Sequence, residues 1–195
     1  VINASLLGAK ILSYSYKYTK KESHLEVAKQ AVNAACQLQE KDGSWIYGLL
    51  PVQSWKDSFH TGFNLDAIET YQQNTQDYSF QNHIDKGLVY YLSNFFEADG
   101  TPKYYHNKTY PIDIHCPAQV IVTLSKLGVF KENEALLFKV LDWTLDNMQH
   151  KNGYFYYQLK KGISSKIPYM RWSNAFMFSA MAHYLMETKN IKHGS

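Results

Sequence analysis

Apolar residues recur at every third or fourth position over three long stretches of the chain, which is the spacing of one face of an α-helix. In the first stretch, Ala28, Val32 and Ala35 mark this face. A second apolar stretch of helical spacing follows each one, as LDAIETY does after Asn64. The pattern predicts three helical hairpins, which span residues about 23–73, 80–128 and 132–187.

The hairpins repeat in register. Asn64, Gln119 and Asn174 follow one another at intervals of 55 residues, and each stands just before or within an apolar helical segment. Between the two helices of each hairpin lies a glycine-marked turn with aromatic residues, in EKDGSWIYG, EADGTPKYY and HKNGYFYYQ. Such a repeat is typical of stacked helical hairpins that bury their apolar faces against one another. Residues 2–18 then fit the second helix of a hairpin whose first helix would precede residue 1, so we expect a C-terminal fragment of a longer protein.

Two local signals predict helix ends. Ser23 and Glu26 have the spacing of a capping box, in which each side chain bonds the backbone N–H of the other, so the first hairpin should begin there. Gly128 directly follows the LSKL segment and is a plausible helix stop.

Composition narrows the classes of protein that fit. With 195 residues, 45% hydrophobic and 15% aromatic, the chain suits one globular domain over residues 1–195. The net charge of +3 is spread along the chain, and KYTKK is its one basic cluster, so we expect no nucleic-acid partner. No apolar run is long enough for a membrane span, and no signal peptide is visible. Cys36 and Cys116 match no metal or disulfide pattern, which favours a reducing compartment such as the cytoplasm.

One turn carries a family resemblance. QEKDGSW, residues Gln39 to Trp45, resembles the QW motif of squalene and hopene cyclases, and QHKNGYF, from Gln149 to Phe155, repeats it more weakly. The arrangement is similar to the α/α-toroid superfamily of terpenoid cyclases, prenyltransferase β subunits, and six-hairpin glycosidases and uronide-processing enzymes. The resemblance implies an all-α fold, an incomplete α/α toroid of about seven helices. It also implies a structural role for the glutamines and aromatic residues of the two motifs.

In such a toroid the second helices form the inner ring, and the loops that enter them surround the open mouth. The loops here are WKDSFHTGFN, YPIDIHCPAQ and IPYMRWSNAF. His60 and His115 are equivalent in the repeat, with Asp57 and Asp113 shortly before them, so we expect these four residues to be catalytic. The alternative is that the aspartates only cap helices.

Substrate contacts are predicted from the same loops. Arg171 is the one arginine in a chain that otherwise uses lysine, and its planar fork suits a carboxylate of a substrate or of an internal salt bridge. Aromatic rings with polar tips suit stacking on sugar faces. The predicted substrate-binding residues are Arg171, Trp172, Tyr105, Trp55, Asn64 and Asn174.

Several reactions fit these residues. Glycoside hydrolysis needs two carboxyl groups about 5 to 9.5 Å apart, which Asp57 and Asp113 could supply. A uronide epimerase or lyase needs a base beside the sugar C5 and cationic or donor groups at the carboxylate. The residues that fit these roles are His60, His115, Tyr105 and Arg171. WKDSFHTGFN is also similar to a W-D-Y-H-T segment of the C-terminal helical domain of glucuronyl C5-epimerases.

The terpenoid and prenyl reactions of the superfamily are less well matched. The DxDD acid motif of hopene-type cyclases is missing. Asp113, His115, Cys116 and His60 are suitable zinc ligands, but the Asp-x-Cys spacing of the prenyltransferases is absent. We therefore expect no cofactor and no metal.

The favoured function is a carbohydrate-active protein that acts on a polysaccharide or a uronic-acid-containing glycan, as a hydrolase, lyase or epimerase. The alternatives are a non-catalytic helical-repeat module for binding or scaffolding, and a terpenoid or prenyl-type enzyme. An open toroid flank would also allow self-association.

Overall fold

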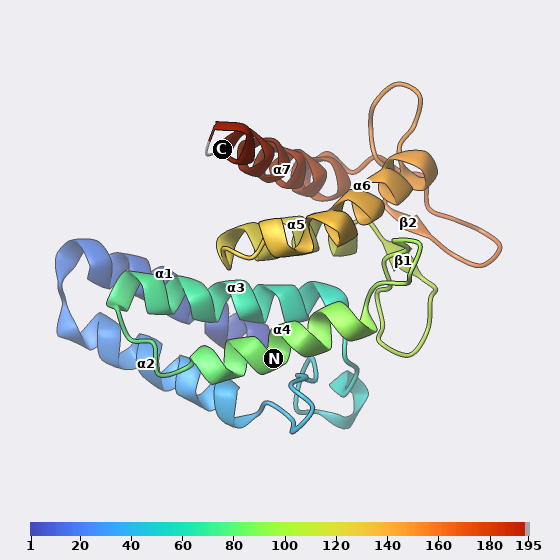
Figure 1. The fold of residues 1–195 in the computed structure, drawn as a ribbon. Coiled ribbons are helices and arrows are strands. Elements are labelled where there is room, and N and C mark those ends of the chain that lie inside the picture. Colours follow the sequence, from blue (N-terminus) through green and yellow to red (C-terminus); the bar gives the residue numbers. More distant parts are fainter. Residues whose placement is uncertain (194–195) are drawn as a thin grey trace. The chain divides into compact units, whose positions relative to one another are not determined.

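A computed structural model describes residues 1–193, with side chains through residue 189. Over this range the chain forms seven α-helices and one short pair of strands (Figure 1). It divides into two compact units, Val1–Ser93 and Asn94–Ser195. None of the helices in the described range is long and apolar enough to cross a bilayer.

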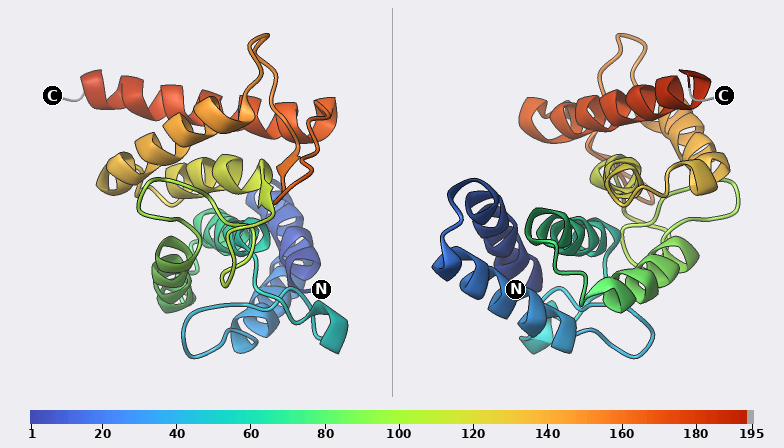
Figure 2. Two further views of the ribbon diagram at one scale, coloured as in Figure 1. Left: turned by 90° about the vertical axis from the view of Figure 1, so that its right-hand side faces the viewer. Right: turned by 60° about the vertical axis from the view of Figure 1, so that its left-hand side comes forward.

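The first unit is built from four helices, α1 (Ile2–Thr19), α2 (Glu22–Gln37), α3 (Ser58–Thr75) and most of α4 (Gln81–Asn94), with a 3-10 turn at Pro51–Gln53. Helix α1 packs against both α2 and α3 (Figures 1 and 2). Its buried residues include Leu6 and Ala9, which lie on one face because they are three residues apart. Lys10 pairs with Asp66 at 2.7 Å and so ties α1 to α3.

Helix α3 is buried on nearly every side. Its buried residues include apolar Leu65 and Ile68 but also polar Asn64 and Asp66. Buried polar side chains need partners inside the protein or a ligand. A helix of this kind suits the inner layer that the hairpin repeat predicts.

The second unit contains α5 (His115–Lys126), α6 (Glu134–Met148) and α7 (Ala175–His193), with a 3-10 turn at Lys131–Asn133. Helix α5 packs against α7 and α6 (Figure 2). Ser125 on α5 bonds Glu187 on α7 at 2.6 Å. Between α6 and α7 the chain forms long loops that extend beyond the helices (Figure 1).

One short sheet holds these loops. Strand β1 (Ile112–Asp113) pairs antiparallel with β2 (Gln158–Leu159), and Asp113 lies opposite Gln158. The sequence did not predict this pairing, which joins the entry loop of α5 to the loop before α7.

The fold is all-α as expected. The predicted capping box is wrong, because α2 begins after Lys21 and no side chain caps it. The stop at Gly128 is confirmed, since α5 ends at Lys126 and Gly128 has a φ of +70°. Cys36 and Cys116 are both buried thiols.

Candidate functional site

The first unit holds Asp57 and His60 as a tight pair at the start of α3. Asp57 is the N-cap, and its Oδ1 accepts the backbone N–H of His60 at 2.8 Å. The same carboxylate lies 2.8 and 2.9 Å from Nδ1 of the His60 ring. A carboxylate accepts hydrogen bonds, so Nδ1 of His60 is the ring nitrogen that donates to Asp57, and Nε2 is the ring nitrogen left for other partners.

Two aromatic residues from the preceding loop complete this pair. Trp55 Nε1–H donates to Asp57 Oδ2 at 3.0 Å. Tyr47 stacks on Trp55, with ring centroids 4.6 Å apart, and meets the His60 ring edge-on at the same separation. The side chain of Asp57 is fully buried, whereas that of His60 keeps 20% of its surface exposed. The histidine is therefore the solvent-facing member of the pair.

Asn64 lies one helical turn after His60, on the same face of α3. It is buried, yet its Oδ1 has no hydrogen-bond partner among the described residues, and neither has Ser58 Oγ. A buried polar atom without a partner costs about 1–3 kcal/mol. A ligand or a water molecule that bonded Asn64 would recover this free energy.

The second unit repeats the arrangement with Asp113 and His115. Asp113 Oδ1 accepts the backbone N–H of His115 at 3.0 Å and lies 2.6 Å from its Nδ1. Asp113 Oδ2 accepts Gln158 Nε2–H at 3.1 Å, a bond that follows from the pairing of β1 with β2. The His115 side chain keeps 12% of its surface exposed, and that of Asp113 keeps 4%.

Aromatic rings extend from His115 towards the entry of α7. Tyr157 lies 6.2 Å from the His115 ring, and Phe176 lies 4.6 Å from it. Tyr157 also packs against Tyr169 and Trp172, at 5.4 and 5.9 Å between centroids. Burial raises the pKa of Tyr157, and the neighbouring Asp113 charge raises that pKa further. Tyr157 is thus held as a neutral phenol, able to donate a hydrogen bond at ordinary pH.

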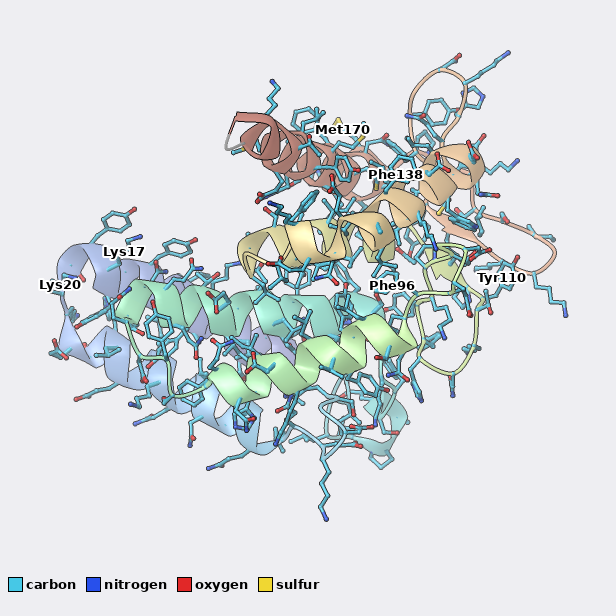
Figure 3. All side chains as sticks on the ribbon, in the orientation of Figure 1. Lys17, Lys20, Phe96, Tyr110, Phe138 and Met170 are labelled. Atoms are coloured by element: carbon cyan, nitrogen blue, oxygen red, sulfur yellow. The ribbon has the colours of Figure 1, made fainter. Side chains whose placement is uncertain are left out.

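Arg171 and Trp172 lie in a π-helical turn, Met170–Asn174, that leads into α7. Together with Tyr169 and Met170 they line an open pocket of about 380 Å³. Arg171 is exposed and has no ion-pair partner within the described part of the chain. Met170 takes the place that histidine has in the other two repeats and is 76% exposed (Figure 3). The third entry loop therefore offers a cation and rings rather than an Asp–His pair.

Two other predicted residues have different surroundings. The Tyr105 ring packs against Tyr104 at 4.7 Å and beneath Lys108 Nζ at 4.4 Å. Asn174 Oδ1 accepts the backbone N–H of Phe155 at 3.0 Å, which ties the α7 entry to the preceding turn. The contact of Asn174 therefore serves the fold.

Three residues that contact the Asp–His pairs were not predicted from the sequence: Tyr47, Tyr157 and Gln158. Trp55 was predicted as a substrate contact, and in the structure its indole N–H bonds Asp57. The aromatic loops were a visible signal for the two tyrosines. Gln158 gave no signal, because it reaches Asp113 only through the strand pairing. In the described residues no three His, Cys, Asp or Glu side chains are grouped to hold a metal ion.

Comparison with solved structures places the fold. The chain is similar to a glycosyl hydrolase family 88 protein from Bacteroides vulgatus, with a TM-score of 0.69 and 11% identity over 92% of this chain and 60% of that one. Cellobiose 2-epimerase from Bacillus thermoamylovorans matches with a TM-score of 0.71 and 11% identity, over 97% of this chain and 60% of that one. A polysaccharide lyase matches with a TM-score of 0.72 and 13% identity, over 95% of this chain and 62% of that one.

The fold is that of the α/α toroids. The α/α-toroid fold that the resemblance of the QW-like turns implied is thus confirmed. The chain spans about three fifths of the length of these matched structures. No protein-family model matches the chain, and no curated protein matches it by sequence.

Proposed function

We propose that the chain is part of a carbohydrate-active protein that acts on a polysaccharide or a uronic-acid-containing glycan. The main support for this proposal is the Asp–His pair, which has the same hydrogen bonds at the start of α3 and again at the start of α5. Helix capping alone needs no imidazole on the carboxylate. The structural neighbours include hydrolases, a lyase and an epimerase, and the name of each refers to a reaction on a carbohydrate.

Within this class, proton transfer by histidine is favoured over a mechanism with two catalytic carboxyl groups. A glycosidase acid must donate a proton from its carboxyl group to the leaving oxygen. Asp57 and Asp113 are buried, and both oxygens of each accept hydrogen bonds from the protein. Carboxylates bound in this way orient and charge-stabilise a histidine, which then acts as the acid or base.

The substrate we propose carries a uronic acid. Nε2 of His115 would remove the proton from C5, and Arg171, in the same unit, would bind the neighbouring carboxylate, which stabilises the negative charge that develops there. In a lyase, the electron pair left at C5 forms a double bond to C4 and expels the oxygen at C4. In an epimerase, a proton returns to C5 from the opposite face. Rings such as Trp172 and Tyr169 would stack on the sugar.

Incubation with uronic-acid oligosaccharides in D₂O tests the proposal. Deuterium at C5 with inverted configuration indicates an epimerase, and a new unsaturated uronate that absorbs ultraviolet light indicates a lyase. His115→Gln should reduce the rate by about 10²-fold or more, whereas His150→Gln should not. New reducing ends without deuterium or unsaturation would contradict the histidine mechanism. An absence of any reaction with every uronate substrate would contradict the catalytic proposal.

A non-catalytic binding module is the second candidate. It is favoured by the use of Asp57 as the N-cap of α3, because a cap explains the aspartate without any reaction. Glycan binding by calorimetry without turnover, with equal affinity in His60→Gln, would support this candidate.

A further inference from the structure

The three glycine turns of the hairpins have one backbone structure. In each, an N–H from the glycine reaches back three residues to a carbonyl: Gly43 to Glu40 at 2.9 Å, Gly100 to Glu97 at 3.0 Å and Gly153 to His150 at 2.7 Å. The φ angles of the glycines are +90°, +95° and +91°. The turns are therefore three copies of the same element and can be compared position by position.

Each of the first two turns is covered by the first helix of the next hairpin. Gly43 is buried against α4, where an added Cβ would lie 2.7 Å from the Lys86 carbonyl carbon. Gly100 is buried against α6 in the same way, 2.5 Å from the Lys139 carbonyl carbon. Only glycine allows these backbones to approach so closely.

The first turn also shows how its covering helix is held. Gln39 Nε2 donates to the Gly43 carbonyl and to the His83 carbonyl on α4, both at 2.9 Å. Trp45 is buried against Gly87 of α4, where an added Cβ would lie 2.6 Å from the indole. A covering helix thus needs a small residue beneath the aromatic ring and an accessible carbonyl for the glutamine.

The third turn has the same parts but is open. Gln149 Nε2 donates to the Gly153 carbonyl at 3.2 Å, as Gln39 does to Gly43, and Phe155 stands buried in the place of Trp45. Gly153 is exposed, and an added Cβ there would meet nothing within 4 Å. Beside it is a pocket of about 260 Å³ lined by Gln149, Gly153, Phe155, Asn174, Phe178 and Met181.

One apolar residue that lines this pocket, Phe178, is largely exposed to solvent. Phe178 on α7 is 77% exposed, although it projects from the same helix as fully buried Met177 and Ala180. An exposed phenylalanine beside the open Gly153 turn makes this face a candidate docking surface.

We infer that the face formed by Gln149, Gly153, Phe155, Phe178 and Met181, here called the third-turn face, binds one further amphipathic helix of the α4 type. That helix has a glycine or alanine over Phe155, a backbone carbonyl in reach of Gln149, and apolar residues against Phe178. The inference continues an interface that the chain already uses twice, at Gly43 and at Gly100. It does not depend on the proposed reaction.

A peptide of the α4 sequence, residues 78–94, tests the inference. A lactam between Asp85 and lysine at position 89, introduced as Val89→Lys, keeps the free peptide helical, since short isolated helices are marginal in water. Both positions are exposed on α4. Binding of the labelled peptide to the intact 195-residue chain is measured by fluorescence anisotropy.

The expected result is saturable binding. It should be about tenfold weaker or worse for the Gly87→Leu peptide, because the added side chain overpacks against the aromatic ring. Protein variants Phe178→Asp and Gln149→Ala should also weaken binding, while Phe138→Asp, exposed on α6 (Figure 3), should not. Circular dichroism checks that each variant is folded.

Three results would overturn the inference: no binding, equal binding of the Gly87→Leu peptide, or unchanged binding by Phe178→Asp. Sedimentation of the chain alone adds a separate outcome. A dimer that Phe178→Asp dissociates and that the peptide does not displace would identify a second copy, rather than an α4-type helix, as the occupant.

Discussion

The aspartates of the two Asp–His pairs are surrounded by donors from three kinds of group. Asp57 accepts from a backbone N–H, an imidazole and an indole, and Asp113 accepts from a backbone N–H, an imidazole and an amide. Charge-assisted bonds of this kind are stronger than neutral ones, and loss of a donor to a buried charge is costly. Each pair is therefore part of the fold as well as a candidate catalytic group.

The Trp55 indole can be tested for its bond to Asp57. Trp55→Phe keeps a ring against Tyr47 but removes the N–H donor, so unfolding in urea should require about 1.5–3 kcal/mol less free energy. Trp172→Phe serves as the control, because Trp172 is 51% exposed, and should change stability by less than about 0.5 kcal/mol. Circular dichroism follows both transitions. Equal stability of the two variants would show that the indole bond does not stabilise the carboxylate.

Arg171 separates binding from folding. Arg171→Lys keeps the positive charge but loses the two-pronged donor geometry, so binding of a uronic-acid oligosaccharide should weaken. The free energy of unfolding should stay within about 1 kcal/mol, because Arg171 is exposed and has no ion pair in the described range. Calorimetry and urea unfolding give the two values. Unchanged affinity would remove Arg171 from the proposed site.

At the scale of elements, the repeated unit is a hairpin whose glycine turn fits under a helix. The conformation of the turn is the same in all three copies, but its surroundings differ. The cost of a side chain at the glycine therefore has two separable parts, backbone strain at positive φ and collision with the covering helix.

Alanine at each turn glycine separates these parts. Gly153→Ala should cost only the strain of positive φ, about 1–2 kcal/mol. Gly43→Ala and Gly100→Ala should cost about 1–3 kcal/mol more, because their Cβ atoms meet the backbone of α4 or α6. Urea unfolding of the three variants provides the comparison. Similar losses in all three would mean that the covering helices shift freely, and would weaken the case for the third-turn face.

At the scale of the whole molecule, stability depends on proton binding because carboxylates are paired in the native state. Burial by itself would raise the pKa of Asp77, but hydrogen bonds from Ser79, Lys29 and Tyr71 outweigh it and hold that pKa well below its usual value. Lys29 of α2 lies 2.9 Å from Asp77, which follows α3, so the charge joins separate parts of the first unit. The unfolded chain binds this proton more readily than the folded one, so acid favours unfolding.

Acid unfolding of Asp77→Asn tests this linkage. The contribution of Asp77 is fully present above the usual aspartate pKa of about 4 and is lost as pH falls towards its lower native value. The variant should be less stable than wild type at pH 7, and the difference should shrink by pH 3. Urea midpoints at both pH values give the answer, with Asp146→Asn, on the exposed side of α6, as the control. A difference that is the same at both pH values would rule out the linkage.

Much of the fold could be predicted from the sequence because its signals are local. Helical periodicity, the interval between hairpins and the glycine of each turn depend on residues a few positions apart, and the structure confirms an all-α fold of seven helices over the described range. The bond within each pair is also local, since Asp57 and Asp113 precede their histidines by three and two residues. The residue types and spacing alone were enough to single out both pairs.

Tertiary structure decided everything that depends on which distant segments meet. Gln158 bonds Asp113 across 45 residues only because β1 pairs with β2. The third entry loop forms a π-helical turn where the repeat predicts an ordinary helix start, so Arg171 and Trp172 line a pocket of their own. The Gly153 turn has the same local sequence signal as Gly43 but remains uncovered. Repeated sequence specifies the local conformation of each hairpin, whereas burial and hydrogen bonding of that hairpin depend on its neighbours.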